Sequence, residues 1–172
     1  NNVQGACDMG ALPNVYTAYQ SVADSAIRQK FETAWGCSLP SQPGLTVTEI
    51  LDAAYNGQIK AIYVMGENPV LSEPQAKHAV EALKKLEFLV VQDVFLTETA
   101  QLAHIVLPGV TFAEKDGTFT NTERRVQLVR KAIEPIGNSK PDWWITCQIA
   151  QRMGGRGFDF AHPSQIMDEI TS

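Results

Sequence analysis

The feature that most constrains the fold is an alternation of apolar runs and amphipathic segments in the middle of the chain. Residues 59–65 and 88–91 are almost entirely apolar, which is typical of strands covered on both faces in a parallel sheet. Between them, apolar residues recur every three to four positions over 74–86 and predict a helix. A short helix from Thr97 and a strand over 104–107 complete the pattern. The predicted fold class is α/β, with a parallel sheet and right-handed crossovers.

The segments on either side are predicted to be less regular. Residues 1–45 are rich in Gly and Pro, which favours irregular structure around one helix. After residue 111 the pattern changes to polar alternation, which predicts antiparallel strands in a small α+β segment. Capping boxes are predicted to begin helices at Thr46, Ser72 and Ser139. The elements expected outside the central pattern are helices at 24–35, 46–55, 143–152 and 163–170 and strands within 117–129.

Composition excludes several classes of protein. The chain has 172 residues, 44% of them apolar, which indicates a folded domain rather than a disordered segment. Lys and Arg number 14 and Asp and Glu 19, so the net charge is −5 and binding to nucleic acid is not expected. Apolar runs are far shorter than the roughly 18 residues of a membrane span. Three distant cysteines without a CxxC pair are expected to be reduced thiols.

Polar residues follow the first two predicted strands of the parallel sheet. Gly66 allows close approach of the backbone to a ligand, and Ser72 is expected to begin a helix whose free N–H groups favour an anion. Gln92, Asp93 and Thr97 follow the second strand and could hydrogen-bond a ribose or a purine. The same residues are also ordinary turn and cap residues. Neither a G-x-G-x-x-G motif nor a P-loop is present, so a nucleotide site here would be unusual.

No set of residues predicts catalysis or metal binding. The three histidines are spread over different segments, and structural or surface roles are favoured for them. The acidic residues after 113 lack a partner at a defined spacing, and of two adjacent arginines in a strand only one can face a given site. The residues weighed in this way are His78, His104, His162, Glu114, Asp116, Glu123, Arg124 and Arg125.

Five sequence blocks carry a resemblance to a known family. They are NNVQGACDMGALP at 1–13, YVMGENP at 63–69, VVQDVFLTETA at 90–100, IVLP at 105–108 and EKDGTFTNTERRVQ at 114–127. In this order they closely resemble the catalytic subunits of molybdenum or tungsten formate dehydrogenases, within the bis-molybdopterin guanine dinucleotide oxidoreductases. The resemblance implies an internal fragment. Residues 1–111 would be an incomplete guanine dinucleotide-binding α/β domain, and residues 112–172 part of the neighbouring domain on the iron-sulfur side.

The resemblance also implies where the cofactor is held. Asn68 and Ser72 stand where some relatives have Asp and Thr, and the block that begins at Gly5 is expected near the pterin. The implied cofactor-binding residues are Gly66, Glu67, Asn68, Ser72, Gln92, Asp93, Thr97, Gly109, Gly5 and Asp8. No catalytic or metal-ligating residue is assigned, since the family's catalytic Arg would fall just before Asn1 and Cys7 does not match its metal ligand.

The implied parent enzyme oxidises formate to carbon dioxide. It would hold bis-molybdopterin guanine dinucleotide with molybdenum or tungsten, bind a 4Fe-4S cluster outside this segment, and work with its remaining domains and electron-transfer subunits. The fragment alone is expected to be inactive and cytoplasmic, with a periplasmic location as the alternative. Two other interpretations stay open: a relative of nitrate reductase or of the NADH dehydrogenase large subunit, or a noncatalytic module that binds a nucleotide or a partner protein.

Overall fold

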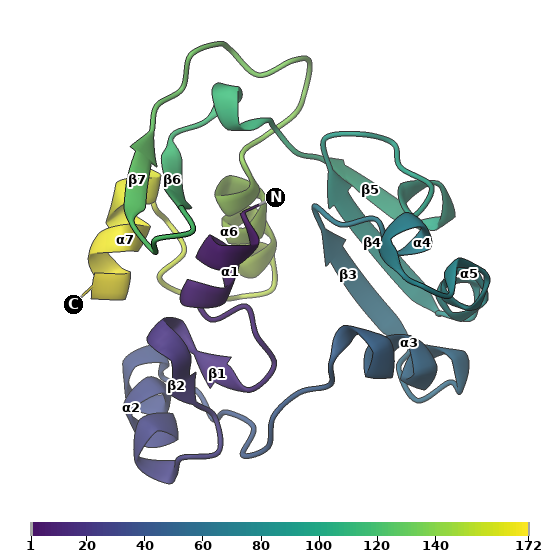
Figure 1. Ribbon diagram of the computed structural model, residues 1–172. Coiled ribbons are helices and arrows are strands. Elements are labelled where there is room, and N and C mark those ends of the chain that lie inside the picture. The colour runs from purple at the N-terminus through teal and green to yellow at the C-terminus, as the bar shows by residue number, and fades with distance from the viewer. Residues whose placement is uncertain (1, 172) are drawn as a thin grey trace. The chain divides into compact units, whose positions relative to one another are not determined.

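The computed structural model describes residues 2–171 and groups them into two compact units (Figure 1). One unit contains the residues up to 48 together with 118–127, and the other contains 49–117 together with 128 onward. The two units group residues that contact one another within this chain. The predicted division at residues 111 and 112 concerns the domains of a longer protein and stays a prediction.

A three-stranded sheet organises the larger unit. Its strands are β3 (Ala61–Met65), β4 (Phe88–Asp93) and β5 (Ile105–Pro108), in the order β3-β4-β5. Both pairings are parallel, with Val64 opposite Val91 and Val90 opposite Ile105. The predicted α/β class and parallel sheet are therefore confirmed, and all three strands end at the same edge.

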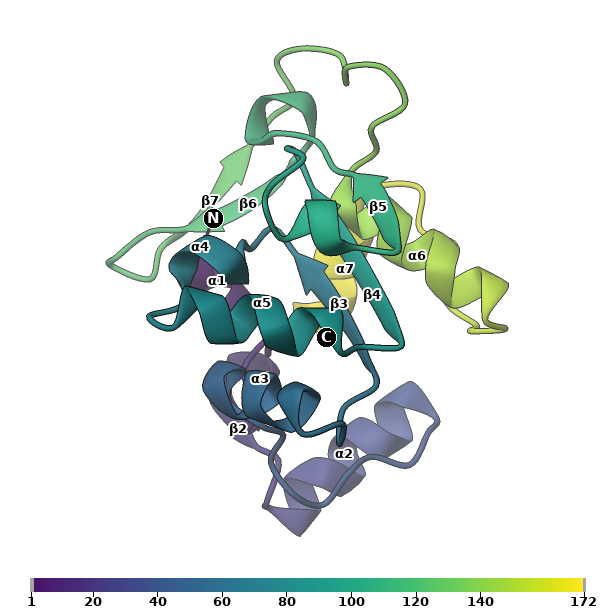
Figure 2. The ribbon, with the colours of Figure 1, turned by 90° about the vertical axis from the view of Figure 1, so that its right-hand side faces the viewer.

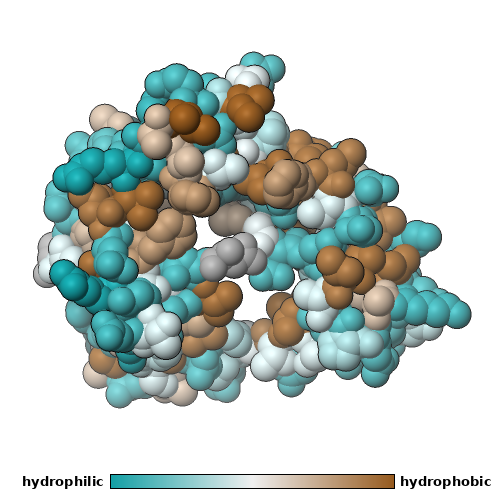
Figure 3. Space-filling model, turned by 45° about the horizontal axis from the view of Figure 1, so that its top comes forward, coloured by the Kyte–Doolittle hydropathy of each residue, from teal (hydrophilic) through white to brown (hydrophobic). Residues whose placement is uncertain are grey.

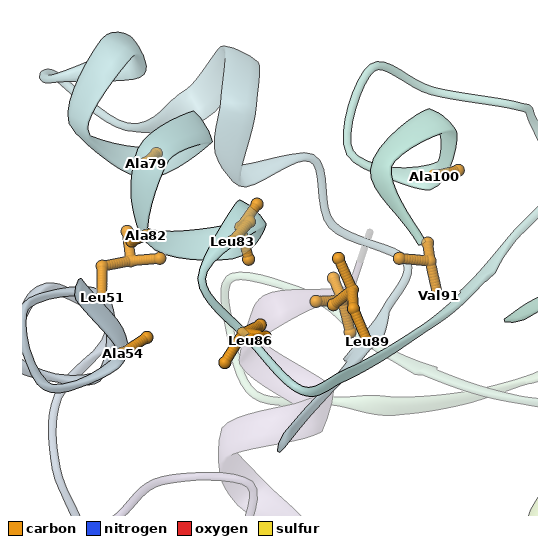
Figure 4. Packing of buried hydrophobic residues seen from close by; sticks show 10 residues of the cluster. Leu51, Ala54, Ala79, Ala82, Leu83, Leu86, Leu89, Val91 and Ala100 are labelled. Carbon is orange, nitrogen blue, oxygen red and sulfur yellow. The ribbon is translucent and has the colours of Figure 1, made fainter. Parts of the chain in front are cut away.

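Helices cover one face of this sheet. They are α3 (Val47–Tyr55), α4 (Pro69–Ser72) and α5 (Ala76–Lys84), and the 3-10 turn η2 (Ala100–Leu102) precedes β5. In Figure 2 α5 lies along β3 and β4. Figure 4 shows the apolar side chains of the helices turned toward those of the sheet. The buried core consists of Leu51, Ala54, Val64, Ala79, Ala82, Leu83, Leu86, Leu89, Val91 and Ala100.

The opposite face of the sheet is covered unevenly. On β4 the residues 89–92 are buried, which confirms the prediction for 89–91, but Phe88 is 44% exposed and the prediction is wrong there. On β3, however, Tyr63 and Met65 are 42% and 46% exposed, so the expectation that this strand is covered on both faces is wrong within this chain. Side chains alternate along a strand, and the helical layer reaches only the face to which Ile62 and Val64 belong.

The rest of the larger unit consists of helices joined by irregular segments. It contains η3 (Phe112–Glu114), α6 (Asp142–Arg152) and α7 (Pro163–Thr171), in agreement with the helices predicted at 143–152 and 163–170. The capping box predicted at Ser139 is wrong. Its hydroxyl donates to the carbonyl of Ile136 at 2.7 Å, and α6 begins directly after Pro141.

The smaller unit is built from short elements. Its longest is α2 (Ser25–Trp35), which begins where the Asp24 carboxylate accepts the N–H groups of Ala26 and Ile27 and ends at Gly36, whose φ is 65°. The three side chains of its core are Tyr16, Val22 and Phe31. The other elements are α1 (Val3–Asp8), β1 (Val15–Tyr16), η1 (Thr17–Tyr19), β2 (Gln20–Ser21) and residues 118–127 of the hairpin that β6 (Gly117–Thr120) and β7 (Val126–Val129) form.

Apolar and polar side chains are interspersed at the surface. Figure 3 shows hydrophobic patches among hydrophilic residues on the visible face. Within residues 2–171, none of the helices combines the length and the apolar character needed to cross a membrane.

Candidate functional site at the carboxyl edge of the parallel sheet

Two loops lie side by side where β3 and β4 end. They are neighbours because Met65 and Gln92 are partners in the parallel register, and the Gly66 N–H donates to the Gln92 carbonyl at 2.8 Å. Loop residues 66–69 and 93–99 therefore meet at one edge. Open α/β sheets bind ligands at this edge, and the structure brings Gly66, Asn68 and Asp93 together there.

Asn68 joins the two loops. Its Oδ1 accepts the N–H of Thr99 at 3.2 Å and the hydroxyl of Thr99 at 2.7 Å. Its Nδ2 donates to the Glu98 carboxylate at 2.7 Å, and this hydrogen bond lowers the pKa of Glu98. Thr99 is fully buried and also receives the N–H of Val70. Asn68 thus holds the loops in register, and its predicted contact with a cofactor stays a prediction.

Gly66, Glu67, Asp93 and Thr97 present small or polar groups at this edge. Gly66 has a φ of 62°, a backbone conformation that favours glycine. The Asp93 carboxylate accepts the Phe95 N–H at 3.1 Å, and the Thr97 hydroxyl accepts the Ala100 N–H at 3.2 Å. Asp93 and Thr97 therefore act as ordinary turn and cap residues, which is the alternative to ligand binding. A carboxylate has lone pairs for further donors, so the two roles are compatible.

Ser72 does not begin a helix. It is the last residue of α4, which starts at Pro69, and the next helix begins at Ala76 after Gln75. Proline is well suited to a helix start because its φ is already helical. The predicted capping box at Ser72, and with it the helix N-terminus offered to an anion there, is wrong. A contact of Ser72 with a cofactor stays a prediction.

Gln92, at the end of β4, belongs to a network of polar side chains. It is fully buried, accepts from the hydroxyl of Tyr63, and donates through Nε2 to Asp142 Oδ1 at 2.7 Å. Lys115 forms an ion pair with the other oxygen of Asp142. Burial, and to a lesser degree the negative charge of Asp142, raises the pKa of Tyr63. The network joins β3, β4 and the start of α6.

Asp142 also explains the glycine at position 109. A Cβ at Gly109 would lie 3.1 Å from Asp142 Oδ1, and the Gly109 N–H donates to the Asp93 carbonyl at 2.9 Å. In the sequence, Asp142 is the fourth residue of the capping box predicted at Ser139, and no local pattern marks Tyr63 or Lys115 as site residues. Asp142 follows Gln92 by fifty residues, so no local pattern could have paired them.

Gly5 and Asp8 lie in the smaller unit, on α1. A Cβ on Gly5 would lie 2.1 Å from Asn2 Oδ1, so a larger residue there would displace the Asn2 side chain. The Asp8 carboxylate accepts from Gln4 at 3.0 Å and pairs with Arg124 at 2.7 Å. Their predicted role near a pterin stays a prediction.

Three other ionisable residues weighed from the sequence, Glu114, His78 and His104, have structural partners. Glu114 is buried and accepts the N–H groups of Thr111 and Ile136 at 2.8 and 2.9 Å. His78 contacts Asp52, and His104 accepts the N–H of Leu89. In the part of the chain that the structure describes, no three or more His, Cys, Asp or Glu side chains are grouped so that they could hold a metal ion.

The comparisons with known proteins agree with one another. A sequence profile described as molybdopterin oxidoreductase matches residues 1–152. An F420-dependent formate dehydrogenase subunit alpha of Methanocaldococcus jannaschii is 54% identical over 99% of this chain and 25% of its own length. A putative formate dehydrogenase of Bacillus subtilis is 48% identical over 100% of the chain and 17% of its own length. The chain therefore spans a quarter or less of these relatives.

A solved structure has a similar fold. The acetylene hydratase from Pelobacter acetylenicus aligns over 90% of this chain and 20% of its own, with a TM-score of 0.60 and 22% identity. At this identity the likeness concerns the fold alone. Because the family profile covers most of the chain and close relatives cover all of it, the chain belongs to the molybdopterin oxidoreductase family and is similar to part of the alpha subunit of formate dehydrogenases.

Proposed function

We propose that the chain is a cofactor-holding segment of a formate dehydrogenase catalytic subunit. It would bind one guanosine and pyrophosphate of bis-molybdopterin guanine dinucleotide at the carboxyl edge of its parallel sheet. The observation that carries the proposal is that Asn68 binds Thr99 and Glu98 and so fixes the two loops at that edge. The names of the most similar relatives support formate as the substrate of the longer protein.

The residues at the edge fit such a group. The carboxylates of Glu67 and Asp93 accept hydrogen bonds, as the N–H groups of a guanine and the hydroxyls of a ribose require. Gly66 has a φ of 62° and no side chain, so the backbone is open to close approach. Gln92 precedes Asp93 in the chain, and its hydrogen bond to Asp142 ties the end of β4 to the start of α6.

In this proposal the chain binds and orients, and it takes no direct part in electron transfer. The bound cofactor supplies the redox centre that accepts two electrons when formate becomes carbon dioxide. Asp93 and Glu67 would hold the guanosine end, and Asn68 would keep both loops in the binding geometry. The 4Fe-4S cluster and the electron-transfer subunits would contact other parts of the longer protein.

The test replaces Asp93 in the complete protein. Asp93→Ala removes the carboxylate and the turn bond to Phe95, whereas Asp93→Asn keeps an oxygen for that bond and removes the charge. We expect both variants to be purified with less metal and pterin than the wild type. The matched control is Asp168→Ala, which removes an exposed carboxylate on α7. The readout is the molybdenum or tungsten and the pterin per mole of protein.

The outcomes separate the alternatives. Unchanged metal and pterin content in both Asp93 variants would contradict the assignment of this edge to the cofactor. A complete wild-type protein without any pterin would favour a noncatalytic module that binds a nucleotide or a partner. A loss in Asp93→Ala but not in Asp93→Asn would mean that the turn, and not the carboxylate, is what the cofactor requires.

A further inference from the structure

Arg124 occupies a backbone position that does not suit arginine. The hairpin turn between β6 and β7 is closed by hydrogen bonds from Arg124 N to the Asn121 carbonyl at 2.9 Å and from Arg125 N to Asn121 Oδ1 at 2.9 Å. Arg124 follows this turn with a φ of 61°. Hairpins of this kind normally place glycine or asparagine there, since a Cβ is strained in the left-handed region. An arginine at such a position raises the question of what its side chain contacts.

The side chain of Arg124 makes two specific contacts. Its Nη2 pairs with Asp8 Oδ1 at 2.7 Å, and its guanidinium lies 4.8 Å from the centre of the Tyr19 ring. Tyr19 and its neighbour Ala18 both have a φ of 59°. The contact between Arg124 and Tyr19 therefore joins two segments whose backbones are in the left-handed region. The Asp8 side chain is only 15% exposed, which strengthens a charged hydrogen bond relative to one in water.

Both ends of α1 are attached to the same hairpin. At the start, Asn2 Nδ2 donates to the Thr120 carbonyl and Asn2 Oδ1 accepts the Thr120 N–H, each at 2.8 Å. At the end, Asp8 is held by Arg124. Between them, the Gln4 amide donates to Asp8 at 3.0 Å and to the Tyr19 hydroxyl at 3.5 Å. The orientation of Gln4 and Asp8 on α1 therefore depends on the arginine.

We propose that Arg124 is a positioning residue that acts through Asp8 to hold α1, and the Gln4 side chain on it, in the geometry that the cofactor requires. This inference rests on the proposed function and on the prediction that the block beginning at Gly5, which lies on α1, is near the pterin. Arg124 itself need not touch the cofactor. Its role is to fix the free end of a six-residue helix, which is too short to be stable alone.

The main test is Arg124→Gly in the complete, cofactor-loaded protein. Glycine suits a φ of 61°, so the turn should form and the variant should fold. We expect hydrogen exchange of the α1 amides of residues 3–9 to rise about fivefold, the effect of losing one ion pair of ordinary strength. We expect kcat for formate oxidation to fall by a similar factor, with metal and pterin content unchanged. Arg125→Ala is the matched control, because it removes the neighbouring positive charge.

A second variant keeps the charge. Arg124→Lys retains a cation but lacks the planar group that pairs with Asp8 and stacks on Tyr19 at once. We expect its kcat and its exchange rates to lie between those of the wild type and Arg124→Gly. This ordering distinguishes a need for the guanidinium from a need for a positive charge alone.

Each outcome supports or overturns the proposal. Faster exchange in α1 together with a lower kcat supports it. Faster exchange with an unchanged kcat would mean that Arg124 only stabilises α1, and unchanged exchange would mean that it does not hold the helix at all; either overturns the proposal. A wild-type protein without pterin or formate activity would overturn the proposed function and the positioning role with it, and that result is visible before any variant is made.

Discussion

Asn68 joins two loops that are thirty residues apart, although the sequence around it is that of an ordinary turn. Gln92 and Glu114 have similar roles, since each is buried and each binds groups from a distant segment. A buried polar side chain must be paired, because an unpaired one costs free energy. At the residue scale, the polar side chains around the site therefore act first as connections between segments.

Glu114 provides a test of this connecting role through pH. The N–H and hydroxyl of Thr111 and the N–H of Ile136 bind its carboxylate and lower its pKa. Because the folded pKa lies below the unfolded one, the stabilisation is complete above the ordinary carboxyl pKa of about 4.3 and is lost as pH falls through the lowered value. We expect Glu114→Gln to be less stable than the wild type at neutral pH, with a difference that shrinks in acid. Urea unfolding midpoints at several pH values measure it, and a difference independent of pH would contradict the expectation.

Helix boundaries show which signals are reliable at the scale of elements. The start of α2 at Asp24 and its end at Gly36 agree with the helix predicted over 24–35, because a cap and a left-handed glycine act locally. The starts predicted at Ser72 and Ser139 are wrong. Near Ser72, the short helix α4 begins at Pro69 and the predicted helix begins only at Ala76, whereas α6 begins directly after Pro141. The fixed φ of proline suits the first residue of a helix, as at Pro69.

The cap of α2 is expected to matter for that helix. Asp24→Ala removes the acceptor for the N–H groups of Ala26 and Ile27, which lie at 2.8 and 3.1 Å. We expect a loss of about 1 kcal/mol, seen as faster hydrogen exchange in the first turn of α2. Asp24→Asn is the control, because it keeps an oxygen for the cap. Equal effects of the two substitutions would mean that charge, and not the cap, stabilises the helix start.

At the scale of the whole molecule, the two units differ in the size of their cores. The core cluster of the larger unit has ten buried apolar residues drawn from its helices and its sheet, whereas the core cluster of the smaller unit has three. The helix-covered face of the parallel sheet, which positions the candidate site, therefore rests on the larger core. On the opposite face, Tyr63 and Met65 stay partly exposed within this chain.

Leu89 tests whether this core behaves as one structure. It is fully buried on β4 and packs among residues of α3, α5 and β3. Leu89→Ala is expected to destabilise the larger unit by about 2–5 kcal/mol, since the cavity adds to the lost burial. Hydrogen exchange should rise in α3, α5 and β4 together. The control Leu128→Ala changes a side chain that is 60% exposed and should have little effect. A rise confined to β4 would contradict a shared core.

The sequence by itself determined the α/β class, the parallel sheet and most of the helices, because apolar periodicity and caps act over a few neighbouring residues. Its blocks also indicated the family, which the profile and the relatives confirm. It placed Gly66, Asn68 and Asp93 near one another, because parallel strands end at one edge. Only the tertiary structure decided that Gln92 meets Asp142 and that Arg124 holds Asp8. These pairs are 50 and 116 residues apart, and they depend on strand register, helix placement and a strained turn, which no local pattern encodes.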